Sequence, residues 1–291
     1  MNFHRSERMF QFTNGLIIFL LSFTMIAPMI HLVAVSLSTP KFAEAKLVYL
    51  WPKGFYTGVY ESLFQMGDMW RAMGVSIYIT LSGTALCLLL TTTLSFTLTR
   101  PAMPARRWLI RLILFTFIFP VPMIPGFLLV KSLGMIDSLW SLIIPGALSA
   151  YFIFINKTFF QGIPAELIDS VKMDGCGEFG VFVRLVLPLS KPVLATIALF
   201  HAVSQWNSYF GALIYIRTKD LFPLQLKLRN LVQSGNNDSG INGYTFDVSA
   251  MQTPEMIKAG AILFSTVPIL IIYPFLQRYF VQGAMLGSLK E

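Results

Sequence analysis

The chain has 291 residues, of which 55% are hydrophobic and 12% are charged, and its formal net charge is +8. Soluble globular proteins carry about 25% charged residues, so this composition, with a mean hydropathy of +0.66, excludes an ordinary soluble domain and indicates a membrane protein. At about 20 residues per spanning helix plus connections, the chain has room for roughly five to seven spans.

Six apolar runs predict six membrane-spanning helices. The runs are continuous over about 20 residues, whereas a β-barrel would show short strands of alternating polarity. The first run exceeds the roughly 7 to 15 residues of a signal-peptide core, so we expect it to remain as a helix. We expect one all-α transmembrane domain over residues 1–291, with spans at about 12–36, 73–98, 108–130, 138–156, 192–216 and 259–280.

Basic residues near the span ends predict the orientation, because lysine and arginine gather on the cytoplasmic side. Arg5 and Arg8 precede the first span, and four arginines lie within 100–111, between the second and third spans. Both termini and residues 157–191 are then cytoplasmic, although five bases in the fifth connection, about 217–258, argue the other way. This bias accounts for the net charge, and no basic face with aromatic platforms indicates nucleic-acid binding.

The sequence lacks the motifs of enzymatic and metal chemistry. Cys87 and Cys176 fall on different sides of this topology and show no metal-ligand spacing, and the histidines His4, His31 and His201 are scattered. No Gly-Lys dipeptide occurs, which excludes a Walker A phosphate loop. We therefore expect no catalytic residue, metal site or cofactor in this chain, and any ATP would be bound by a partner.

The stretch "IPAELIDSVKMDG" interrupts the apolar pattern between the fourth and fifth predicted spans. Pro164 suits the first turn of a helix and Gly175 suits its end, which predicts a short cytoplasmic helix at about 164–175. Its apolar side carries Leu167, Ile168 and Val171, and its polar side carries Glu166, Asp169, Ser170, Lys172 and Asp174. Helices that lie on lipid usually carry a basic polar face, so we favour a helix that docks in a groove of a partner protein.

These residues also carry a family resemblance. The stretches "IPAELIDSVKMDG", "GEFGVFVRLVLPLSKPVLAT" and "QWNSYF" resemble permease subunits of bacterial carbohydrate ABC importers of the maltose type I group, and the likeness extends from about residue 70 onward. The family pattern reads Glu-Ala-Ala, two residues, Asp-Gly, then a spacer that ends in Leu-Pro. The Asp-Gly and Leu-Pro fall on residues 174–175 and 187–188, whereas Asp169, Ser170 and Val171 replace Glu-Ala-Ala.

A finer likeness concerns the substrate. The stretches "AELIDSVKMDGCGEF" and "QRYFVQGAMLGSLKE" are similar to permeases for acidic oligosaccharides, such as alginate or aldouronate fragments. The resemblance implies a type I ABC importer permease in a bacterial inner membrane, working with an ATP-binding subunit dimer that holds ATP and magnesium. It also implies a second, different permease and an extracytoplasmic solute-binding protein. The ATPase would then contact Glu166, Leu167, Ile168, Asp169, Val171, Lys172, Asp174 and Gly175.

Polar residues in the fifth predicted span are the candidates for a substrate path, because polar side chains at bilayer depth tend to face a bundle interior or a cavity. They are His201, Gln205, Trp206, Asn207 and Tyr209. Hydrogen bonding between helices is the alternative role for these residues. An ion-coupled secondary transporter would need intramembrane acids, which the six spans lack. The sequence does not exclude a membrane protein with no transport function.

The fifth connection joins an amphipathic piece, "LFPLQLKLRNLVQ", to a polar piece, "SGNNDSGINGYTF". In the predicted topology it faces the outside, where a solute-binding protein would deliver substrate. Four bases lie between Arg217 and Arg229, and they either steer a polyanionic sugar towards the entrance or simply keep the loop solvated.

Overall fold

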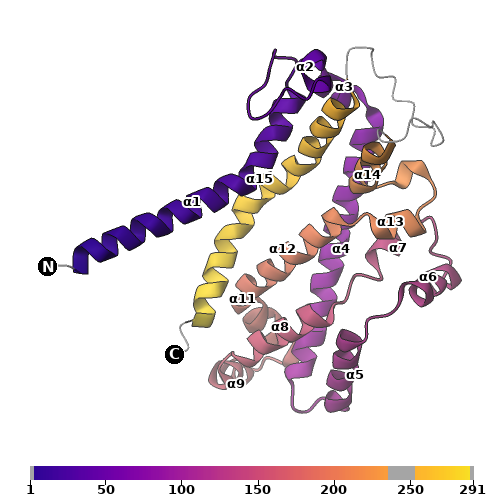
Figure 1. Cartoon of the computed structure of the whole chain (residues 1–291). Helices are drawn as coiled ribbons and strands as arrows, with labels where there is room; N and C mark the ends of the chain where they lie inside the picture. Colours follow the sequence, from indigo (N-terminus) through magenta and orange to yellow (C-terminus); the bar gives the residue numbers. More distant parts are fainter. Residues whose placement is uncertain (1–2, 235–252, 289–291) are drawn as a thin grey trace. The chain divides into compact units, whose positions relative to one another are not determined.

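A computed structural model describes residues 3–234 and 253–288, and helices form nearly all of their regular structure (Figure 1). The extended pairing in these residues is one antiparallel bridge between Ser38 and Phe55. The predicted all-α class is confirmed. The first helices are α1 (Phe3–Ser36), α2 (Pro40–Glu44), α3 (Gly58–Gln65), α4 (Gly67–Thr99), α5 (Arg106–Ile118), α6 (Met123–Ser132), α7 (Trp140–Ile143) and α8 (Ala150–Gln161).

The second half of the chain has shorter helices before a long last one. They are α9 (Ala165–Met173), α10 (Glu178–Val181), the π-helical turn η1 (Phe182–Val186), α11 (Leu187–Leu189), α12 (Lys191–Asn207), α13 (Phe210–Tyr215), the 3-10 turn η2 (Lys219–Leu221), α14 (Leu224–Ser234) and α15 (Pro254–Ser288). The chain forms two compact units, one from residues 1–70 and 228–267 and the other from residues 71–227 and 268–291.

Three helices in the described residues are long and apolar enough to cross a membrane: Glu7–Ser36, Gly67–Thr99 and Pro254–Pro274. Two further spans result if each sharply bent helix pair counts as one span. These pairs are α5 with α6, bent by 117°, and Glu178–Leu189 with α12, bent by 76°. This count rests on length and composition, and the six-span topology with cytoplasmic termini stays a prediction.

Three of the apolar runs that predicted continuous spans form broken helices in the structure. The 108–130 run divides at residues 119–122, where Pro120 and Pro122 lack the N–H groups that a continuing helix needs. The 138–156 run divides after α7, near Pro145 and Gly146. The 192–216 run divides at Ser208, whose backbone is extended. Apolar composition alone does not distinguish a straight helix from a broken one.

In the first unit, α3 packs closely against the N-terminal part of α15. Val59 and Leu63 of α3 are fully buried, and a Cβ on Gly260 would lie 2.7 Å from Val59 Cγ1. Next to this contact the Phe264 ring meets Phe64 and Trp70 edge to face, with ring centroids 6.0 Å and 5.4 Å apart. A glycine on α15 therefore permits the close approach of the two helices.

In the second unit, one apolar cluster joins the end of α4 to the segment around α9. Its buried members are Phe96, Phe160, Val181, Phe182 and Val186. The Phe96 and Phe182 ring centroids lie 4.8 Å apart. The hydroxyl of the preceding residue, Ser95, donates to the Ile153 carbonyl of α8 at 3.1 Å. Residues of α9 pack against this cluster, which therefore holds the helix in place.

Candidate functional site

Helix α9 occupies the position of the predicted docking helix and has well-defined ends. Pro164 precedes the first helical residue, and Gly175 adopts φ +81° after the last turn. The Cys176 N–H donates to the Val171 carbonyl at 3.3 Å and the Gly175 N–H to the Lys172 carbonyl at 3.0 Å. This bonding is that of a Schellman cap, which glycine accommodates because it has no Cβ. The chain therefore reverses sharply after α9.

Two of the three residues predicted to enter a partner's groove turn inward instead. Ile168 and Val171 pack against the apolar cluster of their own unit. Leu167 is exposed, and Met173, which was not among the predicted contacts, is 89% exposed. Because α9 rests on an internal apolar surface, its inner side is already occupied. The outer surface of the helix carries Leu167 and Met173 with the exposed acids Glu166, Asp169 and Asp174.

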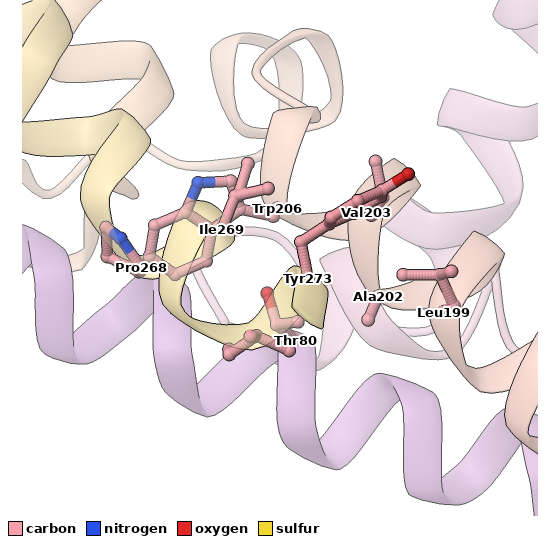
Figure 2. A pocket seen from close by; sticks show the side chains of 9 residues that line it. Thr80, Leu199, Ala202, Val203, Trp206, Pro268, Ile269 and Tyr273 are labelled. Atoms are coloured by element: carbon pink, nitrogen blue, oxygen red, sulfur yellow. The ribbon is translucent and has the colours of Figure 1, made fainter. Parts of the chain in front are cut away.

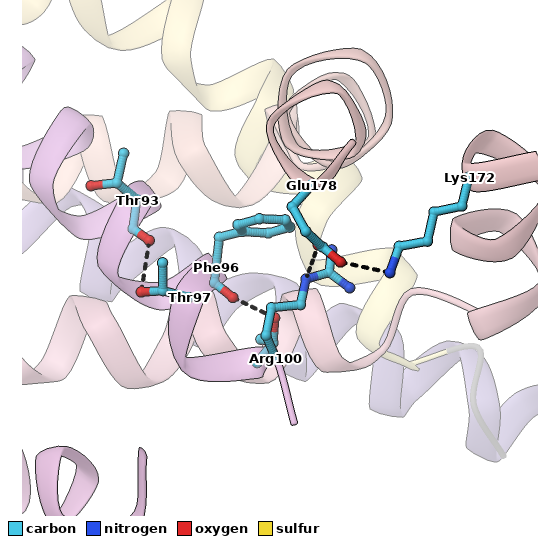
Figure 3. A network of polar contacts seen from close by, with 7 residues as sticks. Thr93, Phe96, Thr97, Arg100, Lys172 and Glu178 are labelled. Carbon is cyan, nitrogen blue, oxygen red and sulfur yellow. Dashed lines mark hydrogen bonds and ion pairs between the residues drawn. The ribbon is translucent and has the colours of Figure 1, made fainter. Parts of the chain in front are cut away.

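A chain of charges ties α9 to the end of α4 (Figure 3). Lys172 Nζ lies 2.6 Å from Glu178 Oε1, and Arg100 Nε lies 3.1 Å from Glu178 Oε2. The Arg100 guanidinium also lies over the Phe96 ring, 4.2 Å from its centroid. Glu178 is the first residue of α10, where a negative side chain is favourable. We call Arg100, Glu178 and Lys172 the charge clasp.

Sequence reasoning missed the role of the charge clasp. Lys172 appeared only as a polar residue and ATPase contact of the docking helix, and Arg100 served only to predict orientation. Glu178 at a helix N-terminus is a local signal that could have drawn attention. Its pairing with Arg100, 78 positions earlier, has no local sequence signal.

The polar residues of α12 lie close to the irregular segment between α7 and α8. Gln205 Nε2 donates to the Leu142 carbonyl at 2.8 Å, and His201 Nε2 lies 3.3 Å from the Gly146 carbonyl. Because a carbonyl only accepts, Nε2 carries the His201 proton, and in the neutral ring Nδ1 accepts from the Thr84 hydroxyl at 3.1 Å. His201 and Gln205 thus satisfy backbone groups that the broken helix leaves open.

The other substrate-path candidates have different surroundings. Trp206 is buried and lines a mostly apolar pocket formed by α4, α12 and α15 (Figure 2). The lining residues are Thr80, Leu199, Ala202, Val203, Trp206, Pro268, Ile269, Ile272 and Tyr273. Asn207 is exposed and bonds to the Val203 carbonyl of its own helix at 2.9 Å, and Tyr209 is exposed just beyond the helix.

A second polar contact holds the connection that follows α13. Both Asp137 carboxylate oxygens accept hydrogen bonds: Oδ1 from the Arg217 and Thr218 backbone N–H groups at 2.9 Å, and Oδ2 from the Thr218 hydroxyl at 2.6 Å. The Thr218 hydroxyl first, and then these N–H groups, hold the pKa of Asp137 below its ordinary value. Asp137 itself has φ +61° and donates its N–H to the Tyr215 carbonyl at 2.8 Å.

The bases predicted in the fifth connection have unequal exposure. Arg217 and Lys219 are exposed, whereas Lys227 and Arg229 are half-buried in α14, which forms from the predicted amphipathic piece. Beside them, Asp220 makes an ion pair with Arg71. The polar piece from residue 235 onward lies outside the described residues.

Comparison with known proteins identifies the relatives of this chain. The family described as "Binding-protein-dependent transport system inner membrane component" matches residues 91–286. In Bacillus subtilis (strain 168), the polygalacturonan/rhamnogalacturonan transport system permease protein YtcP is 40% identical, covering 94% of this chain and 96% of its own. Protein LplC of the same organism is 42% identical, covering 91% of this chain and 89% of its own.

One solved structure matches nearly the whole fold. A chain of a bacterial ABC transporter involved in the import of the acidic polysaccharide alginate superposes with a TM-score of 0.87 at 28% identity. The match covers 95% of this chain and 98% of the other.

Proposed function

This chain belongs to the family of inner-membrane components of binding-protein-dependent transport systems, and from that membership we propose that it is the permease subunit of an ATP-driven oligosaccharide importer. Its relatives include permeases of polysaccharide and oligosaccharide transport systems, and the matching structure is an ABC transporter involved in alginate import. The resemblance expected from the sequence, the type I permease fold and the inner-membrane location are confirmed.

The single observation that carries the mechanical part of the proposal is the mounting of α9. Its inner side packs on the chain's own apolar cluster, its C-terminus is capped, and the charge clasp joins it to the end of α4. A force applied to α9 would therefore move α4 and the following helices as one body. Such a helix suits contact with a partner ATPase dimer, which would bind ATP and magnesium and drive alternating access.

The outer side of α9 is the proposed ATPase contact. Leu167 and Met173 offer exposed apolar anchors, and Glu166, Asp169 and Asp174 surround them with acidic groups. Ile168, Val171 and Gly175 would act from inside by holding the helix, and Lys172 through the charge clasp. A solute-binding protein and a second permease would complete the importer.

Fragments of acidic polysaccharides are the proposed substrates. The support comes from relatives: YtcP is named for polygalacturonan and rhamnogalacturonan, and the matching structure for alginate. In the substrate path we assign Trp206, Asn207 and Tyr209 to the wall, with His201 and Gln205 holding the irregular 142–146 segment in place. The Thr80 hydroxyl supports this assignment, since it is buried beside Trp206 without a hydrogen-bond partner in the described part of the chain.

A cysteine cross-link tests the proposed ATPase contact. In a background with Cys87 and Cys176 replaced by serine, Met173→Cys is paired with cysteines in the groove of the co-expressed ATPase subunit. We expect a cross-link whose yield changes at least twofold with ATP. Leu133→Cys, at a position that is 62% exposed at the end of α6, is the control and should give no link. Absence of any link from residue 173, with ATP-independent uptake, would overturn the proposal and favour an ion-coupled transporter.

A further inference from the structure

The connection between α2 and α3, residues 45–57, presents large apolar side chains outward. Tyr49 is 71% exposed, Trp51 82% and Phe55 73%, and Leu47 and Leu50 are also exposed. An exposed cluster of this kind usually marks a surface that meets another apolar phase or partner. We call residues 45–57 the aromatic loop.

The aromatic loop has a built conformation, so the exposure does not come from a lack of structure. Within the loop, the side chain of Val48 is buried. The Thr39 N–H donates to the Lys53 carbonyl at 3.1 Å, and the Lys53 N–H to the Ser38 hydroxyl at 3.0 Å. Gly54 adopts φ +68°, and a Cβ there would lie 2.8 Å from Thr39 Oγ1, so the loop depends on glycine at this turn.

One hydrogen bond sets the depth of the loop along α1. His31 Nδ1 donates to the Tyr49 carbonyl at 2.8 Å. His31 lies five residues before the end of α1 at Ser36, which at a rise of 1.5 Å per residue is about 7.5 Å down the helix axis. The Tyr49 to Trp51 segment therefore lies beside the last turns of the apolar helix, and Figure 1 shows the connection between α2 and α3 beside the end of α1.

The last turns of α1 also carry exposed apolar side chains, on the sides of the helix that face away from His31. Met25, Ile26, Ile30 and Val33 lie on its last turns, and none of the most apolar 18-residue stretch of α1 is buried within the chain. The aromatic loop thus lies beside the end of a helix that presents apolar side chains outward. A membrane span that meets an aromatic segment at its end has the arrangement of a bilayer interface, where tryptophan and tyrosine are enriched.

Charged residues in the loop fit the same environment. Lys46 and Lys53 are exposed, one before Tyr49 and the other after Trp51 in the sequence. Lysine side chains near the end of a span extend their ammonium groups to the lipid phosphates while their methylene stems stay in the apolar region. A soluble partner would not need the loop to lie at this depth along α1.

We propose that the aromatic loop is an interfacial anchor that binds the boundary between phospholipid headgroups and acyl chains beside α1. Tyr49 and Trp51 occupy this boundary, and Lys46 and Lys53 contact the phosphates. The anchor fixes the depth of the first span in the bilayer. The inference holds whichever side of the membrane the end of α1 faces, so its failure would leave the permease function untouched.

Fluorescence quenching in vesicles tests the anchor. The complete transporter is reconstituted in phosphatidylcholine that carries bromine either at carbons 6 and 7 or at carbons 11 and 12 of one acyl chain. The difference between the unmodified protein and Trp51→Phe reports residue 51 alone. We expect this emission to be quenched at least twice as strongly by the shallow bromines as by the deep ones. Trp70→Phe is the control, because the Trp70 ring packs on Phe64 and Phe264 and should respond less.

A second readout avoids the difference method. Trp51→Cys, in the same Cys87 and Cys176 serine background, is labelled with a bimane dye and measured in the same vesicles. Shallow quenching in both experiments supports the anchor. Quenching by neither lipid overturns it, and a signal that instead changes on addition of the solute-binding protein would assign the loop to a soluble partner.

Discussion

Glu178 is the residue on which the charge clasp depends, because its two oxygens serve Lys172 and Arg100 separately. Glu178→Gln keeps the shape and removes the charge from both pairs. Glu178 and Lys172 are 54% and 42% exposed and Arg100 is 18% exposed, so we expect the free energy of unfolding to fall by about 1 kcal/mol. ATP-dependent uptake should nevertheless fall several-fold, because α9 loses its fixed connection to the end of α4. Uptake is measured in vesicles at equal protein content.

Two variants separate this effect from a general loss of charge. Lys172→Gln breaks one pair and leaves Arg100 beside Glu178, so it should reduce uptake less than Glu178→Gln does. Glu44→Gln, at the exposed end of α2, makes the same chemical change away from the clasp. Normal uptake by Glu178→Gln would show that the clasp does not transmit motion.

Asp137 makes a different kind of contact, because hydrogen bonds from Thr218 and Arg217 lower the pKa of its carboxyl group. A carboxyl group whose pKa is lowered on folding stabilises the fold above its ordinary value of about 3.9 and loses that contribution as the pH falls through the lowered value. Hydrogen exchange at Arg217 and Thr218, corrected for intrinsic rates, should therefore not vary between about pH 5 and 8. Asp137→Asn should accelerate exchange at both residues several-fold. Thr218→Val, which removes only the hydroxyl donor, should have a smaller effect, and unchanged exchange in Asp137→Asn would contradict the assignment.

At the scale of elements, α9 depends on a single backbone conformation at its end. Gly175 has φ +81°, and a Cβ added there would meet open space, so any cost of Gly175→Ala comes from the backbone alone. That cost is about 1 kcal/mol. We expect a lower melting temperature and a weaker cross-link from Met173→Cys to the ATPase. Gly177→Ala also adds a Cβ in open space, but at an ordinary φ of −71°, and should change neither. Equal effects of the two substitutions would rule out the cap as the cause.

The short helix α9 could be predicted because its signals are local. Proline before it, glycine after it and a mixed polar and apolar sequence between them all lie within a dozen residues. The inward direction of Ile168 and Val171 could not be predicted, since it depends on Phe96 and Phe182 from distant segments. The broken spans show the same limit: Pro120 and Pro122 were visible, but hydropathy averaged over 20 residues does not respond to a missing N–H.

The polar end of α12 shows why residue type alone predicts a site incompletely. His201 and Gln205 were predicted to line a substrate path because polar side chains at bilayer depth need polar partners. In the structure their partners include the carbonyl groups of Leu142 and Gly146, which lack helical partners because the fourth predicted span is interrupted. A residue that holds the wall and a residue that contacts substrate carry the same sequence signal. Trp206, which lines a pocket, is the member whose surroundings fit the predicted role most directly.

At the scale of the whole molecule, an importer of polyanions needs to attract its substrate across solvent. In the fifth connection, which the predicted topology places outside, Arg217 and Lys219 are the exposed bases. Electrostatic steering raises the association rate and falls as salt shortens the Debye length from about 30 Å at 0.01 M to about 3 Å at 1 M. The structure therefore divides the four predicted bases into an exposed pair and a half-buried pair on α14.

This division makes the steering hypothesis testable with matched charges. The double variant Arg217→Gln with Lys219→Gln should lower the initial uptake of an acidic oligosaccharide several-fold at low salt, and the difference should vanish at high salt. Lys227→Gln with Arg229→Gln removes the same charge from less exposed positions and should have a smaller effect. Equal loss of neutral and acidic sugar uptake would indicate structural damage instead of lost steering. Unchanged uptake of the acidic sugar at low salt would leave the bases as residues that only keep the loop in water.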